Sequence, residues 1–386
     1  MKQRIPLFEN FNPEEITGIT NAESLTDMSH FGVVYRGSVL NEKPGIYGIS
    51  HLTEHLVCKA IDHLQDTFDA DGIDWNAYTT GTYIYFYMTG LDEYINKYKS
   101  EFLKCLLNFK ITKEEFENEK KIVLEEYGDS FNRQSSAHFL NVLRKTYNNY
   151  SAIGLRKDLE DLTYEMMLEF VAKQYAKPHQ IINISKHNRF TQKVDLSTNV
   201  PSTKYVKGTY DAPVEEGNEY KGKSSIMNFS DLITEDIAYV NFICSMLGRG
   251  LNSPLYKEIR EKRGLVYSIG CSFQELTYTE GLVIINAESS TKNIDEFQTT
   301  LEMVLKNPDT YMTKERFDIV KKSYVIKFKK QEINRYDNFE KFIDEPSTRV
   351  ETIISDITLE KVLDVYKKYF NFDNFHKSID TEELKK

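Results

Sequence analysis

Two histidines and a glutamate lie within five consecutive residues, His51-Leu52-Thr53-Glu54-His55. Residues three and four apart share one face of a helix, so His51, Glu54 and His55 can point towards a single ion. Neutral imidazoles are good ligands for Zn²⁺, and two of them leave positions open for a third ligand and a water. The ion lowers the pKa of that water, and a carboxylate beside it can take the proton during attack on a peptide carbonyl. The spacing therefore predicts zinc-dependent hydrolysis, with His51 and His55 on the metal and Glu54 as the general base.

An ordinary amphipathic helix is the alternative interpretation of this five-residue motif. Its histidines and glutamate would then face solvent or hydrogen-bond one another. The motif alone leaves both interpretations open, so a second carboxylate at a suitable place in the sequence becomes important.

A helix-forming segment rich in glutamate, residues 113–127, provides this second signal. Glu119 and Glu126 are seven residues apart and share a helix face, whereas Glu125 points away from both. Apolar residues occur in the same segment: Phe116, Ile122, Val123 and Leu124. A glutamate beside apolar surface needs a partner, and a divalent cation held by two histidines would be one. The alternative is a charged helix on the protein surface.

These two segments resemble the pitrilysin-type zinc peptidases, which include insulin-degrading enzyme and the mitochondrial processing peptidase. Gly37-Ser38, and Gly48-Ile49-Ser50 leading into His51, are similar to that family's strand, loop and zinc helix. The stretch from Glu119 to Glu126 resembles its E-x6-E element. The resemblance covers nearly the whole chain and implies that Glu126 is the third zinc ligand and that Glu119 supports the site.

The segment Asn76-Ala77-Tyr78-Thr79 resembles the family's N-A-x-T segment. The resemblance implies an edge strand along which an extended substrate lies, with Asn76, Ala77 and Thr79 as substrate-binding residues. Residues 79–88 are β-branched and aromatic, which predicts a strand there independently of the resemblance.

A glycine-containing segment in the second half of the chain, residues 247–267, also resembles the family. The resemblance implies that Arg260 and Tyr267 reach the zinc site and contact substrate backbone or the developing oxyanion, a role that suits guanidinium and phenol donors. Spacing alone favours the alternative, a surface arginine and a half-buried strand tyrosine, and the match of the surrounding segment reverses that preference.

The composition limits the class of protein. The chain has 386 residues, 40% of them hydrophobic, and a formal net charge of −10. This length indicates two domains, and the negative charge disfavours nucleic-acid binding. The four cysteines form no C-x-x-C pair, no signal peptide is recognisable, and no window approaches eighteen apolar residues. We therefore expect a cytoplasmic protein that is not inserted in a membrane.

The predicted elements follow a similar order in the two halves of the chain, which indicates an α+β fold. We predict a zinc-binding module over residues 1–187, a linker over 188–224 and a second, similar module over 225–386. Each module is expected to be a mainly antiparallel sheet with helices packed on one face. The resemblance further implies that chains of this length pair into an enclosed chamber, as a homodimer or a heterodimer with a related chain.

The sequence therefore predicts a metallopeptidase that acts on unfolded peptides and contains one Zn²⁺ per chain. Two rival functions stay open. One is a non-catalytic peptide-binding or assembly subunit with the same fold, and the other is a chaperone-like protein that encloses peptides but cleaves them slowly.

Overall fold

A computed structural model describes residues 16–214, 223–343 and 348–381. The chain forms two compact units, and neither is continuous in sequence. The first unit contains the described parts of Met1–Tyr127, Tyr150–Thr203 and Lys329–Pro346. The second contains the described parts of Gly128–Asn149, Lys204–Phe328 and Ser347–Lys386.

The first unit is built on a five-stranded sheet in the order β1-β5-β2-β4-β3. Its strands are β1 (Gly18–Glu23), β2 (Met28–Arg36), β3 (Asp74–Thr79), β4 (Tyr83–Leu91) and β5 (Gln180–Ser185). β1 and β5 pair in parallel, and the other pairs are antiparallel. β3 lies at the edge of the sheet, so its outer backbone groups can pair with another extended chain.

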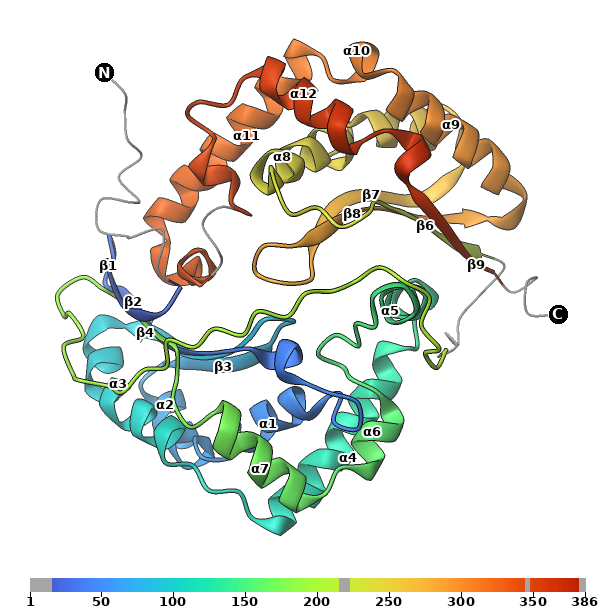
Figure 1. Ribbon diagram of the computed structural model, residues 1–386. Helices are drawn as coiled ribbons and strands as arrows, with labels where there is room; N and C mark the ends of the chain where they lie inside the picture. The colour runs from blue at the N-terminus through green and yellow to red at the C-terminus, as the bar shows by residue number, and fades with distance from the viewer. Residues whose placement is uncertain (1–15, 215–222, 344–347, 382–386) are drawn as a thin grey trace. The chain divides into compact units, whose positions relative to one another are not determined.

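Helices cover one face of this sheet (Figure 1). They are α1 (Ile49–Cys58), α2 (Gln65–Ala70), α3 (Asp92–Leu107), α4 (Lys113–Ser130) and α7 (Tyr164–Gln174), and the short α6 (Arg156–Asp161) precedes α7. On β2, Phe31 and Tyr35 point towards this layer, since Phe31 packs against Phe102 of α3 and the Tyr35 hydroxyl donates to the Leu106 carbonyl. This layer fixes the position of α1 against the sheet.

The opposite face of the same sheet is covered by a segment from late in the chain. His30 of β2 stacks on Phe339, with ring centroids 4.1 Å apart, and Phe339 lies in the 3₁₀ turn Phe339–Phe342. Val34, Tyr83 and Tyr85 belong to the same buried cluster. Both faces of β2 are therefore covered, which explains why eight of its nine residues are buried.

The second unit contains a four-stranded antiparallel sheet in the order β7-β8-β6-β9. Its strands are β6 (Lys223–Phe229), β7 (Val266–Glu275), β8 (Gly281–Ser290) and β9 (His376–Thr381). Its helices are α5 (Gln134–Tyr147), α8 (Ile237–Gly248), α9 (Ile294–Lys306), α10 (Pro308–Tyr311), α11 (Lys314–Ile333) and α12 (Leu359–Tyr369), and α11 continues into the first unit. α5 packs on β6 and β8 through Leu143 and Tyr147.

The predicted α+β class, with two sheets and packed helices, is confirmed. Residues 204–210, within the predicted linker, have no regular secondary structure. The helix that carries the H-x-x-E-H motif ends at Cys58 and is followed by a 3₁₀ turn, Asp62–Leu64. None of the described helices combines the length and apolar composition that a bilayer crossing requires.

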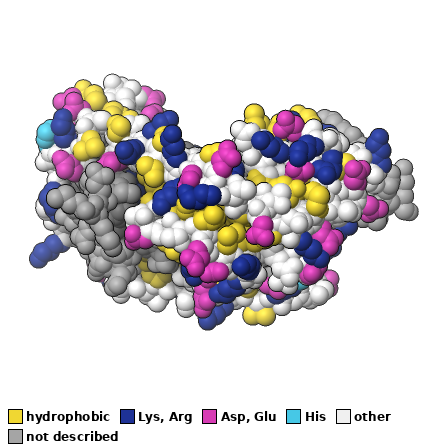
Figure 2. Space-filling view, turned by 90° about the horizontal axis from the view of Figure 1, so that it is seen from above, with side chains coloured by type: hydrophobic (Ala, Val, Ile, Leu, Met, Phe, Trp, Pro, Cys, Tyr) yellow, Lys and Arg dark blue, Asp and Glu magenta, His cyan; other side chains and the backbone are white. Residues whose placement is uncertain are grey.

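Charged side chains of both signs lie on one face of the molecule. On the face drawn in Figure 2, the described Lys and Arg side chains are interspersed with Asp and Glu. The described part of this face therefore does not form the continuous basic surface that binding to nucleic-acid backbones requires.

Candidate active site

A loop held by a buried carboxylate leads into α1. Gly48, the residue before the helix, adopts a left-handed conformation with φ 100°. Glu42 accepts the backbone N–H groups of Gly48 at 3.0 Å and Ser50 at 2.9 Å. These are donors that the first turn of a helix leaves without a backbone partner, so Glu42 acts as the cap of α1. The cap fixes the position of the first turn of α1, and His51 is the residue directly after Ser50.

His51 and His55 of α1 and Glu126 of α4 converge at one point. One ligand atom from each residue lies within 4.8 Å of the other two. Glu126 Oε2 is 3.4 Å from His51 Nε2 and 3.6 Å from His55 Nε2. The two imidazole rings are nearly perpendicular, with centroids 4.8 Å apart. The structure thus brings together the three residues that the sequence predicted as metal ligands.

The two distances from Glu126 to the histidines suit a tetrahedral zinc ion. Zinc bonds to nitrogen and oxygen are about 2.0–2.1 Å long, which places two tetrahedral ligand atoms roughly 3.3 Å apart. The two nitrogen–oxygen distances are close to this value. The donor set, two imidazoles and one carboxylate, is also one that zinc hydrolases use. Burial, together with the neighbouring His55, lowers the pKa of His51 to about 4, so its imidazole is neutral and able to bind a metal at neutral pH.

The orientation of the His55 ring is fixed by Glu119. Glu119 Oε2 lies 3.2 Å from His55 Nδ1. A carboxylate can only accept a hydrogen bond from this nitrogen, so the proton lies on Nδ1 and Nε2 keeps its lone pair. This places Glu119 behind a metal-binding histidine, where such carboxylates commonly lie in metal sites.

Lys59 is a member of this group that sequence reasoning missed. Its Nζ lies 3.3 Å from Glu119 Oε1 and 3.1 Å from Asp62 Oδ2. The available signal was spacing, since Lys59 follows His55 by four residues and therefore lies on the same side of α1. Residues 51, 55 and 59 form one stripe.

Glu54 is buried, and its carboxylate has a single hydrogen-bonding partner among the residues that the structure describes. Thr79 Oγ1 of β3 donates to Glu54 Oε2 over 2.7 Å, which leaves Oε1 available. Burial raises the pKa of Glu54, and the nearby Glu126 carboxylate adds to this effect. The Thr79 hydrogen bond and His55 act in the opposite direction. The carboxyl group is therefore a stronger base than an exposed glutamate.

The predicted substrate-binding residues lie on the edge strand β3, as the resemblance implied. Asn76 is exposed, and Ala77 and Thr79 are partly exposed. β3 pairs with β4 on one side only. Because Thr79 also contacts Glu54, this edge of the sheet lies directly beside the candidate general base.

Arg260 and Tyr267 lie together in the second unit. Arg260 belongs to a π-helical turn, Tyr256–Glu261, and its Cζ is 5.8 Å from the centre of the Tyr267 ring. Tyr267 is 67% exposed and therefore differs from a half-buried strand tyrosine.

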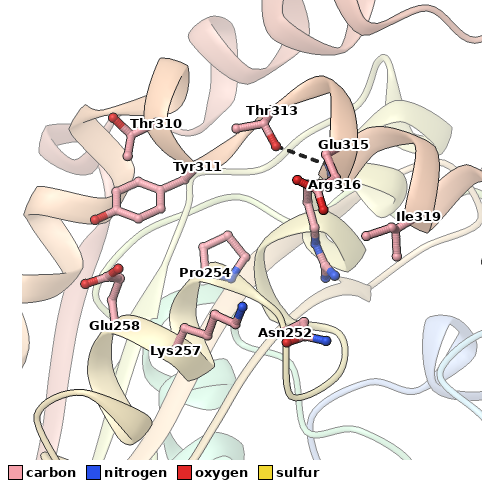
Figure 3. Close-up of a pocket in the computed structure, with 10 residues that line it drawn as sticks. All are labelled: Asn252, Pro254, Lys257, Glu258, Thr310, Tyr311, Thr313, Glu315, Arg316 and Ile319. Carbon is pink, nitrogen blue, oxygen red and sulfur yellow. Dashed lines mark hydrogen bonds between the residues drawn. The ribbon is translucent and has the colours of Figure 1, made fainter.

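A cavity of about 330 Å³ also lies in the second unit (Figure 3). Its most deeply placed charges already have partners. Arg316 donates to three backbone carbonyls, and Glu258 pairs with Lys262 and Arg263. The cavity contains none of the predicted site residues, and it offers no comparable chemistry.

Two family descriptions match consecutive parts of the chain. The family described as "Insulinase (Peptidase family M16)" matches residues 19–156, which include the complete metal group. The "Peptidase M16 inactive domain" matches residues 192–324. The chain belongs to the M16 peptidase family. In this M16 chain, residues 192–324 contain no histidine, so the second matched region cannot hold another copy of the H-x-x-E-H motif.

Relatives and solved structures agree with this assignment. An "Uncharacterized zinc protease" of Rickettsia felis is 22% identical over 94% of the M16 chain and 96% of its own length. The "Uncharacterized zinc protease YmxG" of Bacillus subtilis is 22% identical over 69% of each chain. A protease from Helicobacter pylori has the same fold, with a TM-score of 0.81, 17% identity, and coverage of 94% of this chain and 96% of that one.

Proposed function

We propose that this chain is a zinc-dependent peptidase that hydrolyses peptide bonds in unfolded peptides or small proteins. The observation that supports this most directly is the convergence of His51, His55 and Glu126 on one point, with distances that suit zinc. In the proposed site these three residues hold one zinc ion. When bound, the ion supplies Lewis acidity to the scissile carbonyl and to a water molecule.

Glu54 is the proposed general base. Its Oε1 accepts the proton of the attacking water, because Oε2 already accepts the Thr79 hydroxyl. Glu54 then donates this proton to the leaving amine. Thr79 holds the carboxylate in one orientation throughout, and Glu119 holds the His55 ring.

The substrate is proposed to add to the first sheet as a strand beside β3. Asn76, Ala77 and Thr79 line that edge, and main-chain hydrogen bonds would bind a peptide there with little dependence on sequence. Only an extended chain can pair in this way. The proposed substrates are therefore peptides and unfolded proteins, and folded domains are excluded.

Arg260 and Tyr267 are proposed to contact the substrate or the developing oxyanion in a closed chamber. The support for this role is the family resemblance, together with their position beside each other and their exposure. The chamber is proposed to form in a homodimer, or in a heterodimer with a related chain.

A peptide-binding or assembly subunit without catalysis is the alternative function. His51, His55 and Glu126 converge, and the Glu54 carboxylate is held by Thr79 with one oxygen available, which favours hydrolysis over this alternative. A chaperone-like protein that cleaves slowly would have the same groups. Only the rate of peptide cleavage distinguishes it from a peptidase.

Turnover of a quenched fluorescent peptide library tests the proposal, with zinc content measured on the same samples. We expect Glu54→Gln to reduce turnover by at least ~10²-fold, since an amide cannot accept the proton. Glu125→Gln is the matched control, because Glu125 is an exposed glutamate on α4. No turnover by the zinc-loaded native protein, with any library, would favour the non-catalytic alternative.

A further inference from the structure

Tyr267 is the extra residue of a β-bulge on an edge strand. β7 pairs with β8 through Val266 and Ser289, and then through Ser268 and Glu288, so Tyr267 has no partner in the ladder. Bulges at sheet edges re-aim a side chain away from its regular direction. Here the re-aimed side chain is a tyrosine that is two-thirds exposed.

Two cations from separate parts of the chain contact this ring. Lys223 Nζ, at the start of β6, lies 4.5 Å from the ring centre, and Arg260 Cζ lies 5.8 Å from it. Arg260 also packs on Tyr256, with its Cζ 5.1 Å from that ring centre. Cation–π contacts therefore hold both positive groups at the Tyr267 ring.

Neither cation forms an ion pair with a carboxylate in the part of the chain that the structure describes. The neighbouring Lys262 and Arg263 behave differently, since both pair with Glu258. Glu288 lies on β8 two residues from Ser290, which pairs with Lys223, but it forms no ion pair with Lys223 or Arg260 among the described residues. Two positive charges held at one ring repel each other, and an anion would remove that repulsion.

We infer that Lys223, Arg260 and Tyr267 form a carboxylate-binding site that gives the peptidase a preference for acidic substrates. An ammonium, a guanidinium and a phenol hydroxyl provide charge-assisted hydrogen bonds that suit a carboxylate. In a peptide this group is either an Asp or Glu side chain or the C-terminal carboxylate. The inference rests on the proposed function, because the ligand is the peptide substrate.

Equilibrium binding to the Glu54→Gln protein tests the site without turnover. The probes are fluorescent nonapeptides that contain Glu, Gln or Lys at one position, each with a free or an amidated C-terminus. We expect the Glu peptide, or the free-acid form, to bind about tenfold more tightly than its neutral counterpart at low salt. The ratio should fall as ionic strength rises. The two pairs of peptides distinguish a side-chain carboxylate from the terminal one.

Substitution of Lys223 decides whether this cluster is responsible. Lys223→Ala should bring the ratio close to one, Lys223→Arg should retain most of it, and Lys223→Glu should favour the Lys peptide. Lys327→Ala, at an exposed lysine of α11, is the control and should leave the ratio unchanged. Equal binding of the acidic and neutral peptides, or an undiminished ratio in Lys223→Ala, would overturn the inference.

The peptidase proposal can fail independently of this site. Absence of turnover in the native protein, with the acidic preference in binding retained and dependent on Lys223, would reject hydrolysis and keep the carboxylate site. Turnover that depends on Glu54 but not on substrate charge would keep hydrolysis and reject the carboxylate site.

Discussion

Lys59 contacts Glu119, the carboxylate that orients a candidate zinc ligand. Lys59 Nζ and His55 Nδ1 lie 3.3 Å and 3.2 Å from the two different oxygens of Glu119. Each oxygen therefore has its own partner, and rotation of the carboxylate would break both contacts. The ammonium holds Glu119 in the orientation that His55 requires.

Removal of this ammonium should weaken zinc binding. Partners of metal ligands typically change metal affinity by about 10–100-fold, and Lys59 acts one residue further out, so we expect Lys59→Met to weaken affinity by up to about tenfold. Competition with a chelator measures the affinity. Lys59→Arg should restore most of it, and Asp62→Asn, which alters the other partner of Lys59, should have a smaller effect. An unchanged affinity in Lys59→Met would show that Glu119 holds its orientation unaided.

The zinc content of the protein should depend on the three proposed ligands and not on Glu54. We expect one zinc per chain in the native protein and its loss when His51, His55 or Glu126 is replaced by Gln. Glu54→Gln should retain the zinc, because Glu54 is proposed to act on the water. Elemental analysis after gel filtration provides the measurement. Loss of zinc from Glu125→Gln, with retention in Glu126→Gln, would place the third ligand one residue earlier.

The Thr79 hydroxyl should affect the rate without affecting the metal. Loss of one hydrogen bond to a charged group costs about 1.5–3 kcal/mol, so Thr79→Val should lower kcat roughly tenfold or more. Thr79→Ser keeps the hydroxyl and is the control. Steady-state kinetics and zinc content should be measured together. A lower zinc content in Thr79→Val would mean that the threonine supports the metal site as a whole.

Arg260 and Tyr267 are expected to act in trans. Arg260→Ala or Tyr267→Phe should reduce turnover at unchanged zinc content. An inactive Glu54→Gln chain mixed with an inactive Arg260→Ala chain should regain part of the activity, because a mixed dimer contains one site with both parts intact. Subunit exchange is verified with differently tagged chains. Exchange without recovery would restrict the pair to its own chain.

His138 should make stability depend on pH. It is buried between the hydroxyls of Ser225 and Ser378, and burial lowers its pKa to about 4 from an ordinary value of 6.5. The unfolded chain therefore binds more protons between pH 6.5 and pH 4, so this contribution is present above pH 6.5 and lost as the pH falls towards 4. The full loss of unfolding free energy from this one histidine is on the order of 3 kcal/mol.

Chemical unfolding at pH 7.5 and pH 4.5 measures this effect. His138→Gln should reduce the fall in unfolding free energy between the two pH values. His63→Gln, at an exposed histidine, is the control and should leave the fall unchanged. An equal fall in native and His138→Gln proteins would assign the acid sensitivity to other groups.

Local patterns predicted those parts of the fold that short-range physics determines. The helical spacing of His51, Glu54 and His55 corresponds to α1. The strand predicted over residues 79–88 is only partly confirmed, because β3 ends at Thr79 and β4 begins at Tyr83. The shared face of Glu119 and Glu126 also corresponds to their positions on α4, towards the two histidines.

Contacts between distant residues were beyond local patterns. Nothing near His30 indicates that Phe339, some 300 residues later, stacks on it. The contact between Lys223 and Tyr267 depends on a β-bulge. A single extra residue in a strand cannot be recognised from the composition of the segment. The Thr79–Glu54 hydrogen bond likewise requires the packing of α1 on the sheet.

The discontinuous course of the chain has a consequence for fragments of this protein. The polypeptide changes unit five times, after Tyr127, Asn149, Thr203, Phe328 and Pro346. A fragment that stops in the middle of the chain therefore lacks Phe339 and Phe342, and the apolar side chains of Val34 and Tyr85 would lose their cover. Each such side chain contributes about 1.5–3 kcal/mol when buried. Neither half of the polypeptide contains a complete unit, so we expect the metal site and the Tyr267 cluster to be present only in a chain that contains both halves.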